Sequence, residues 1–125
     1  MVQSEKKKIL VVDDSETNLL LLSAVLEDAG YEVKLMSNSY QAVQYIHDHQ
    51  PDLILLDLLM PGMDGFEFME RLRNGHNRQM YPVVVVTAYD NHDNTKKAMD
   101  LGAEDVINKP IDINNFLMKV EQIVN

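Results

Sequence analysis

Five short runs of apolar residues alternate with longer segments of mixed polarity along the chain. The apolar runs lie at residues 9–12, 33–36, 53–56, 83–86 and 106–107. Three of them are four-residue blocks without polar alternation, which is typical of strands buried on both faces of a parallel sheet. The second run is interrupted by Lys34 and the fifth is shorter, so these two are predicted to be edge strands.

The segments between the runs have the three-and-four spacing of amphipathic helices. The first predicted helix has one apolar face, made of Leu19, Leu22, Leu26 and Ala29. Gly30 follows that face and is predicted to end the helix. Asn38, Asp64 and Asp112 are residue types that commonly cap helix N-termini. These three residues begin predicted helices at residues 38–49, 64–75 and 112–124, and a further helix is predicted at residues 91–101, where Gly102 ends it.

Strand and helix alternate five times in this pattern, which predicts an α/β fold with one parallel sheet covered by helices on both faces. A length of 125 residues corresponds to one domain, and no linker or repeat interrupts it, so residues 1–125 are expected to form a single domain. Open sheets of this kind bind ligands beyond the carboxyl ends of their strands. The residues just after each strand are therefore the candidates for chemistry.

Composition excludes several classes of function. The formal net charge is −9, and an acidic protein repels phosphate backbones, so no direct binding to nucleic acid is expected. The absence of cysteine excludes disulfides, thiolate nucleophiles and cysteine-based zinc sites. No apolar stretch approaches the roughly 20 residues of a membrane span, and residues 1–8 lack the apolar core of a signal peptide. We therefore expect a cytoplasmic protein without a membrane partner.

Reactive side chains follow four of the predicted strands. Asp13 and Asp14 follow the first strand, Asp57 the third and Thr87 the fourth, and Lys109 comes soon after the fifth. If the first and third strands are neighbours, the carboxylates share one cleft, where like charges raise one another's pKa unless a positive charge intervenes. A hard divalent cation meets that need, and Mg²⁺ is the usual one where phosphate is handled. The set suits a site that accepts a phosphoryl group on a carboxylate.

Four segments of the chain carry a resemblance to a known family. They are VVDDS at residues 11–15, LDLLMPGMDG at 56–65, VTA at 86–88 and NKP at 108–110. In this order, and at the ends of predicted strands, they resemble the receiver domains of two-component response regulators, the CheY-like superfamily, over residues 7–124. The resemblance implies a flavodoxin-like (βα)5 fold with strand order 2-1-3-4-5, which acts as a phosphoacceptor domain.

The resemblance implies a role for each acidic residue. Asp57 matches the aspartate that takes a phosphoryl group, in a Mg²⁺-dependent reaction, from a phosphohistidine on a sensor histidine kinase or a histidine phosphotransfer protein. Asp13 and Asp14 match the acidic pair that binds Mg²⁺ together with Asp57. The backbone carbonyl of Leu59 matches a further ligand of the metal.

The same resemblance implies how the signal leaves the site. Thr87 matches the hydroxyl that hydrogen-bonds a phosphoryl oxygen and moves toward it on activation, and Lys109 matches the lysine that pairs with the phosphate. The Lys109–Pro110 bond matches a cis peptide, which X–Pro sequences make accessible. Phosphorylation is expected to alter the face of the fourth helix, fifth strand and fifth helix, where an output domain or downstream protein binds. This makes the domain a switch and not an enzyme.

Two features depart from the usual pattern of the family. Activated receivers usually carry an aromatic switch residue three positions before the lysine, and this chain has Val106 there. The usual coupling of Thr87 movement to rotation of a buried ring is therefore put in question. Leu59 and Tyr89, two positions after Asp57 and Thr87, are bulky. Because such positions influence how water reaches the acyl phosphate, we expect slow self-dephosphorylation.

Two alternative hypotheses use the same fold. One is a phosphorylation-independent binding module, favoured by Val106 alone, and the other is a metal-dependent phosphohydrolase. Such hydrolases usually need a second acid two residues after the nucleophile, where this chain has Leu59. The sequence leaves open the cognate kinase, the output function and the formation of a homodimer. It also leaves open whether the receiver stands alone, precedes an output domain or belongs to a hybrid kinase.

Overall fold

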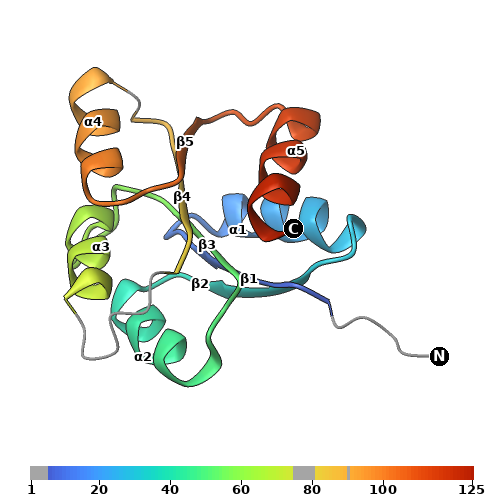
Figure 1. Cartoon of the computed structure of the whole chain (residues 1–125), viewed down its shortest axis with the longest axis horizontal. Coiled ribbons are helices and arrows are strands. Elements are labelled where there is room, and N and C mark those ends of the chain that lie inside the picture. The colour runs from blue at the N-terminus through green and yellow to red at the C-terminus, as the bar shows by residue number, and fades with distance from the viewer. Residues whose placement is uncertain (1–5, 75–80, 90) are drawn as a thin grey trace.

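Each apolar run forms a strand in the computed structural model, which describes residues 6–74, 81–89 and 91–125 (Figure 1). The strands are β1 (Lys8–Val12), β2 (Glu32–Met36), β3 (Leu53–Leu56), β4 (Val83–Thr87) and β5 (Asp105–Asn108). All neighbouring strands pair in parallel, in the order β2-β1-β3-β4-β5. The predicted order is therefore confirmed, and the second and fifth strands are the edges, as their broken or shortened apolar runs indicated.

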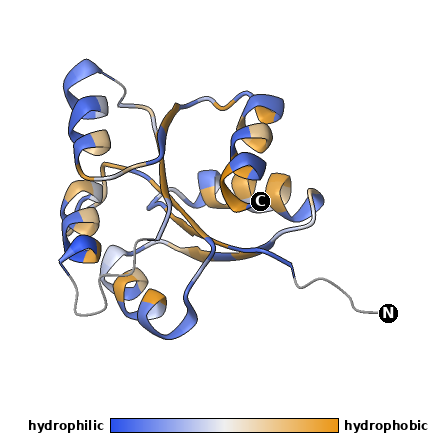
Figure 2. Cartoon of the chain, viewed as in Figure 1, coloured by the Kyte–Doolittle hydropathy of each residue, from blue (hydrophilic) through white to orange (hydrophobic). Residues whose placement is uncertain are grey.

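Five helices in the described part of the chain cover both faces of the sheet. They are α1 (Glu16–Asp28), α2 (Ser39–His49), α3 (Gly65–Arg73), α4 (His92–Asp100) and α5 (Ile113–Val124). Helices α1 and α5 pack on one face, and α2, α3 and α4 pack on the other (Figure 1). Figure 2 shows their apolar sides turned toward the sheet. No helix among the described residues has the length and apolar character needed to cross a membrane.

The core lies in two layers, one on each side of the sheet. Along β1, Ile9 and Val11 belong to the layer under α1 and α5, whereas Leu10 and Val12 belong to the layer under α2, α3 and α4. The largest fully buried side chains include Phe116 in the first layer and Phe68 in the second. Burying such a side chain contributes roughly 1.5–3 kcal/mol. The two layers hold the central strands rigidly, and with them the residues at the strand ends.

The helix ends differ from the predictions at a few positions. The caps Asn38, Asp64 and Asp112 are confirmed, since each side chain accepts hydrogen bonds from amides in the first turn. Ala29 was wrongly predicted on the apolar face: α1 ends one residue earlier, and Ala29 is exposed beside Gly30, whose φ is +98°. Helix α3 ends at Arg73, and the predicted end near residue 75 lies outside the described residues.

Candidate functional site

The predicted site residues meet at the carboxyl edge of the sheet. The amide of Asp13 donates to the carbonyl of Met36 at 3.1 Å, and the amide of Asp57 donates to the carbonyl of Val12 at 3.0 Å. Parallel pairing thus continues one residue beyond β1 and β3, and it fixes the backbone of both aspartates. Because β1 and β3 are neighbours, the two carboxylates are forced into one cleft.

Three carboxylates form a cluster with the spacing of metal ligands. One oxygen from each of Asp13, Asp14 and Asp57 lies within 4.8 Å of the others. Asp13 is 2% exposed and Asp57 is 8% exposed, whereas Asp14 is open to solvent. Hard oxygen ligands of this kind suit Mg²⁺, which usually takes one or two carboxylates and keeps several waters. The chemistry of the donor set therefore fits the metal implied by the sequence.

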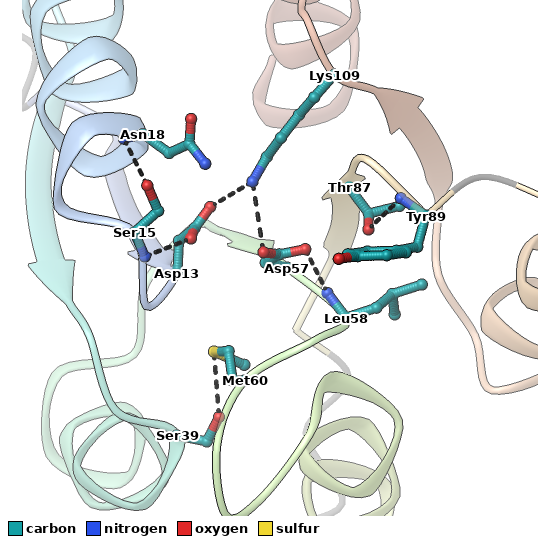
Figure 3. A network of polar contacts seen from close by, with 10 residues as sticks. All are labelled: Asp13, Ser15, Asn18, Ser39, Asp57, Leu58, Met60, Thr87, Tyr89 and Lys109. Carbon is teal, nitrogen blue, oxygen red and sulfur yellow. Dashed lines mark hydrogen bonds and ion pairs between the residues drawn. The ribbon is translucent and has the colours of Figure 1, made fainter.

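Lys109 brings a positive charge to the two buried acids (Figure 3). Its Nζ lies 2.7 Å from Oδ2 of Asp13 and 3.4 Å from Oδ2 of Asp57. The lysine is anchored to the end of β4, because its amide donates to the carbonyl of Thr87 at 2.9 Å. The predicted cis peptide between Lys109 and Pro110 is present.

The surroundings of Asp57 disfavour its ionised form. Burial raises the pKa of the Asp57 carboxyl above its ordinary value, and the negative charge of Asp13 raises it further. Lys109 lowers the same pKa, as do hydrogen bonds from the Leu58 amide and the Thr87 hydroxyl, but these effects do not outweigh the burial. An additional cation in the cleft would relieve this cost, which is a second reason why the site suits a divalent metal.

Asp13 is held from two sides. Its Oδ1 accepts a hydrogen bond from the amide of Ser15 at 2.8 Å, while its Oδ2 accepts from Lys109. Ser15 in turn caps α1 by accepting from the amide of Asn18 at 3.3 Å. Each carboxylate oxygen has two lone pairs, so these contacts orient Asp13 and still leave lone pairs for a cation. The adjacent aspartates of the sequence therefore differ in environment: Asp13 is held by hydrogen bonds and Asp14 is exposed.

An open hollow of about 410 Å³ adjoins Asp57. It is lined by Asp14, Asp57, Leu59, Met60, Pro61 and Tyr89. Thr87 is fully buried at the end of β4, and its Oγ1 accepts a hydrogen bond from the amide of Tyr89 at 3.1 Å. Tyr89 is 53% exposed, and its ring extends toward Asp57 (Figure 3). The hollow leaves the Asp57 carboxylate accessible from solvent.

The loop after β3 carries one contact that the sequence did not indicate. The hydroxyl of Ser39, 2% exposed at the start of α2, donates to the sulfur of Met60 at 3.6 Å. The two residues are 21 positions apart, and neither type signals such a contact. The bond ties α2 to the segment that includes Leu59, the predicted carbonyl ligand, which lies beside Asp57 in the wall of the hollow.

Comparisons with known proteins agree with this geometry. The family model described as response regulator receiver domain matches residues 9–121. The chain is 36% identical over 118 residues to the alkaline phosphatase synthesis transcriptional regulatory protein PhoP of Bacillus subtilis, a match that covers 94% of this chain and 48% of PhoP. It is 32% identical over 117 residues to protein PilH of Pseudomonas aeruginosa, covering 94% of this chain and 97% of PilH.

The fold has close counterparts among solved structures. The chemotaxis protein CheY4 of Vibrio cholerae matches with a TM-score of 0.88 at 28% identity, over 95% of this chain and 99% of that one. The chain spans about half the length of PhoP and nearly all of PilH. The family match, the strand order and the acidic cluster agree, and the chain belongs to the response regulator receiver domains, the phosphorylation switches of two-component signalling.

Proposed function

We propose that Asp57 accepts a phosphoryl group from a phosphohistidine on a sensor kinase or a histidine phosphotransfer protein, in a reaction that requires Mg²⁺. The observation that carries the proposal is the clustering of three carboxylates within 4.8 Å beside the ammonium group of Lys109. Residues 1–125 act in this proposal as one phosphoacceptor domain, in the cytoplasm.

Asp13, Asp14, Asp57 and the carbonyl of Leu59 are the groups that would hold the metal. Once bound, Mg²⁺ supplies positive charge that offsets the clustered acids and stabilises phosphoryl oxygens. The raised pKa of Asp57, caused first by burial, favours any ligand that neutralises the carboxylate. Asp13 is already oriented by Ser15 and Lys109, so little reorganisation is needed to bind.

The transfer itself is a displacement at phosphorus. A carboxylate oxygen of Asp57 attacks the phosphorus, the bond between phosphorus and the histidine nitrogen breaks, and its electron pair stays on the imidazole, which takes up a proton. The ammonium of Lys109 and the hydroxyl of Thr87 flank Asp57 and are placed to stabilise the charge on the phosphoryl oxygens. The open hollow beside Asp57 admits the donor.

The phosphoryl group carries about −1.5 to −2 charges and replaces the single negative charge of the Asp57 carboxylate, and we propose that the face formed by α4, β5 and α5 responds. These elements carry exposed apolar side chains, including Met99, Ile113 and Met118. An ion pair at 2.8 Å between Lys119 and Asp105 joins α5 to β5. The proposed partner on this face is an output domain or a downstream protein. The domain acts as a switch, with slow loss of its own phosphate.

The test is phosphorylation by acetyl phosphate with and without Mg²⁺, read by intact mass. We expect a single phosphate adduct that depends on Mg²⁺ and is absent from Asp57→Asn. Asp48→Asn, which removes an exposed acid of α2, is the matched control and should be phosphorylated like the wild type. A folded, Mg²⁺-binding protein without an adduct would instead favour the phosphorylation-independent binding module.

A further inference from the structure

Tyr89 is hydrogen-bonded through its backbone to both the site and the helix that follows. Its amide donates to Oγ1 of Thr87 at 3.1 Å. Its carbonyl accepts from Nδ2 of Asn94, in the first turn of α4, at 3.0 Å. A short chain of hydrogen bonds thus runs from Thr87, beside Asp57, to the start of α4.

Helix α4 is weakly anchored to the rest of the domain. All nine of its residues are described, and Ala98 alone is buried. The helix begins at the cap Asn91, whose side chain accepts from the amide of Asn94 at 2.8 Å. The Asn94 amide therefore donates to the capping side chain of Asn91, while the Asn94 side chain donates to the carbonyl of Tyr89. A helix with so little buried surface is sensitive to polar contacts at its first turn.

The hydroxyl of Thr87 can transmit a movement without losing its partner. A hydroxyl has one donor and two acceptor positions, so Thr87 can donate to a phosphoryl oxygen while it still accepts from the Tyr89 amide. A shift of the hydroxyl toward Asp57 then draws the Tyr89 backbone with it. The Tyr89 ring lines the hollow beside Asp57, so a phosphoryl group also meets this residue directly (Figure 3).

Val106 is aliphatic, so β5 lacks the aromatic side chain whose rotation could otherwise transmit a movement of Thr87. Strand β5 contains Asp105, Val106, Ile107 and Asn108, and none of them is aromatic. Val106 is partly buried against the core layer under α2, α3 and α4. No ring in β5 can rotate in response to Thr87, so a signal to α4 has to leave the site through other residues.

We propose that Asn94 is a positioning residue that couples the state of Asp57 to α4 through its hydrogen bond to the Tyr89 carbonyl. The inference rests on the proposed function, since it describes what phosphorylation of Asp57 does next. When Thr87 and the phosphoryl group displace Tyr89, its carbonyl moves relative to Asn94, and the first turn of α4 shifts or loosens. In this chain the hydrogen bond between Asn94 and Tyr89 takes over the task of an aromatic switch in β5.

The experiment compares amide NMR shifts of α4 before and after phosphorylation with acetyl phosphate and Mg²⁺. The wild type should show shifts in the first turn of α4. Asn94→Ala should be phosphorylated to the same extent by mass and lose most of these shifts. Asn94→Asp should lose the same shifts as Asn94→Ala, because a carboxylate cannot donate a hydrogen bond to the Tyr89 carbonyl. A carboxylate is nevertheless favourable near a helix N-terminus. Loss of the shifts in this variant is therefore due to the missing hydrogen bond and not to a poorly formed helix.

Asn115→Ala is the matched control. Asn115 occupies the corresponding place in α5, where its amide donates to the cap Asp112 at 3.2 Å, and the variant should keep the wild-type shifts in α4. Wild-type shifts in phosphorylated Asn94→Ala and Asn94→Asp would overturn the coupling and leave the proposed function intact. So would a phosphorylated wild type without shifts in α4. A wild type that takes up no phosphate would overturn the proposed function and the coupling together.

Discussion

Gly65, the first residue of α3, packs directly against the main chain of Asp57. A Cβ at position 65 would lie 2.5 Å from the carbonyl oxygen of Asp57 and 2.8 Å from Cα of Leu58. The Gly65 amide donates to the carbonyl of Leu58 at 2.8 Å. The start of α3 is therefore locked onto the backbone that carries the nucleophile, and only glycine permits this approach.

Gly65→Ala is expected to push α3 away from Asp57. Overpacking of this kind costs about 1–3 kcal/mol of folding free energy, and the displaced Asp57 should weaken Mg²⁺ binding. Urea denaturation and calorimetric titration with Mg²⁺ measure the two effects. Gly30→Ala is the control: no atom lies within 4 Å of its Cβ, but φ is +98°. It should cost about 1–2 kcal/mol and leave Mg²⁺ affinity unchanged. If Gly65→Ala bound Mg²⁺ as tightly as Gly30→Ala, the predicted displacement of Asp57 would be contradicted.

The raised pKa of Asp57 gives stability a defined pH dependence. Burial, opposed by Lys109 and reinforced by Asp13, places the folded-state pKa above the ordinary value of 3.8. The folded protein binds the proton of the Asp57 carboxyl more tightly than the unfolded chain does, so ionised Asp57 destabilises the fold at neutral pH. The destabilisation is absent below the ordinary pKa, grows as the pH rises toward the folded-state pKa, and is constant above it.

Asp57→Asn should therefore be more resistant to urea than the wild type at neutral pH without divalent metal. The stability difference between the variant and the wild type should shrink on acidification and vanish below about pH 3.8, because position 57 is then uncharged in both proteins. Urea midpoints over a pH series measure the difference. An advantage that stays constant over the whole series would show that ionisation of Asp57 is not its cause.

Mg²⁺ should stabilise the folded protein, since the unfolded chain lacks the cluster of acids. A free concentration one hundred times the Kd adds about 2.7 kcal/mol to the free energy of unfolding. Asp13→Asn should lose most of this gain at the same concentration, and chelation of the metal should reverse it in the wild type. Thermal unfolding with and without Mg²⁺ is the measurement. An undiminished gain in Asp13→Asn would remove Asp13 from the metal site.

Lys109→Met should slow phosphorylation by acetyl phosphate. The variant removes the ammonium group that lies 3.4 Å from Asp57, and loss of one such charge-stabilising donor reduces rates by roughly 100-fold or more. The initial rate of adduct formation at saturating Mg²⁺ is the readout. Lys96→Met, which breaks only an exposed pair with Asp100, should retain the wild-type rate. Equal rates for the two variants would exclude Lys109 from the chemistry.

The phosphorylated wild type should lose its phosphate slowly, with a half-life well beyond seconds. Leu59 and Tyr89 both line the hollow at Asp57, where they limit the approach of water to the acyl phosphate. Tyr89→Ala should hydrolyse faster, on the order of tenfold, because the shielding ring is gone. The decay of the adduct by mass after removal of acetyl phosphate gives both rates. A wild-type half-life of seconds would refute the shielding role.

The strands were predictable because their signal is local. Unbroken apolar blocks such as residues 53–56 lose their contact with water only between two covered faces, and strands β3 and β4 are buried along their whole length. The end of the first helix was harder to place. Ala29 continues the apolar spacing but lies beyond the last helical residue, next to a glycine with φ of +98°. Periodicity alone cannot decide whether the final residue of a face is still covered.

The site residues could be named from the sequence because each follows a strand, and parallel strands end at one edge. Their unequal roles could not. Asp13 is buried and paired with Lys109, while the adjacent Asp14 is exposed. The difference arises where the chain turns after β1, which buries one of the two adjacent side chains and leaves the other on the solvent side of the cluster.

The order of the elements, the edge strands and the reactive side chains follow from the sequence alone, because hydrophobic period and position after a strand are properties of a short segment. The contacts between distant segments follow only from the packing of the whole fold. Lys109 meets Asp13 across 96 positions, and Ser39 meets Met60 across 21. Each depends on how packed layers set the distance and direction between elements, which no local pattern encodes.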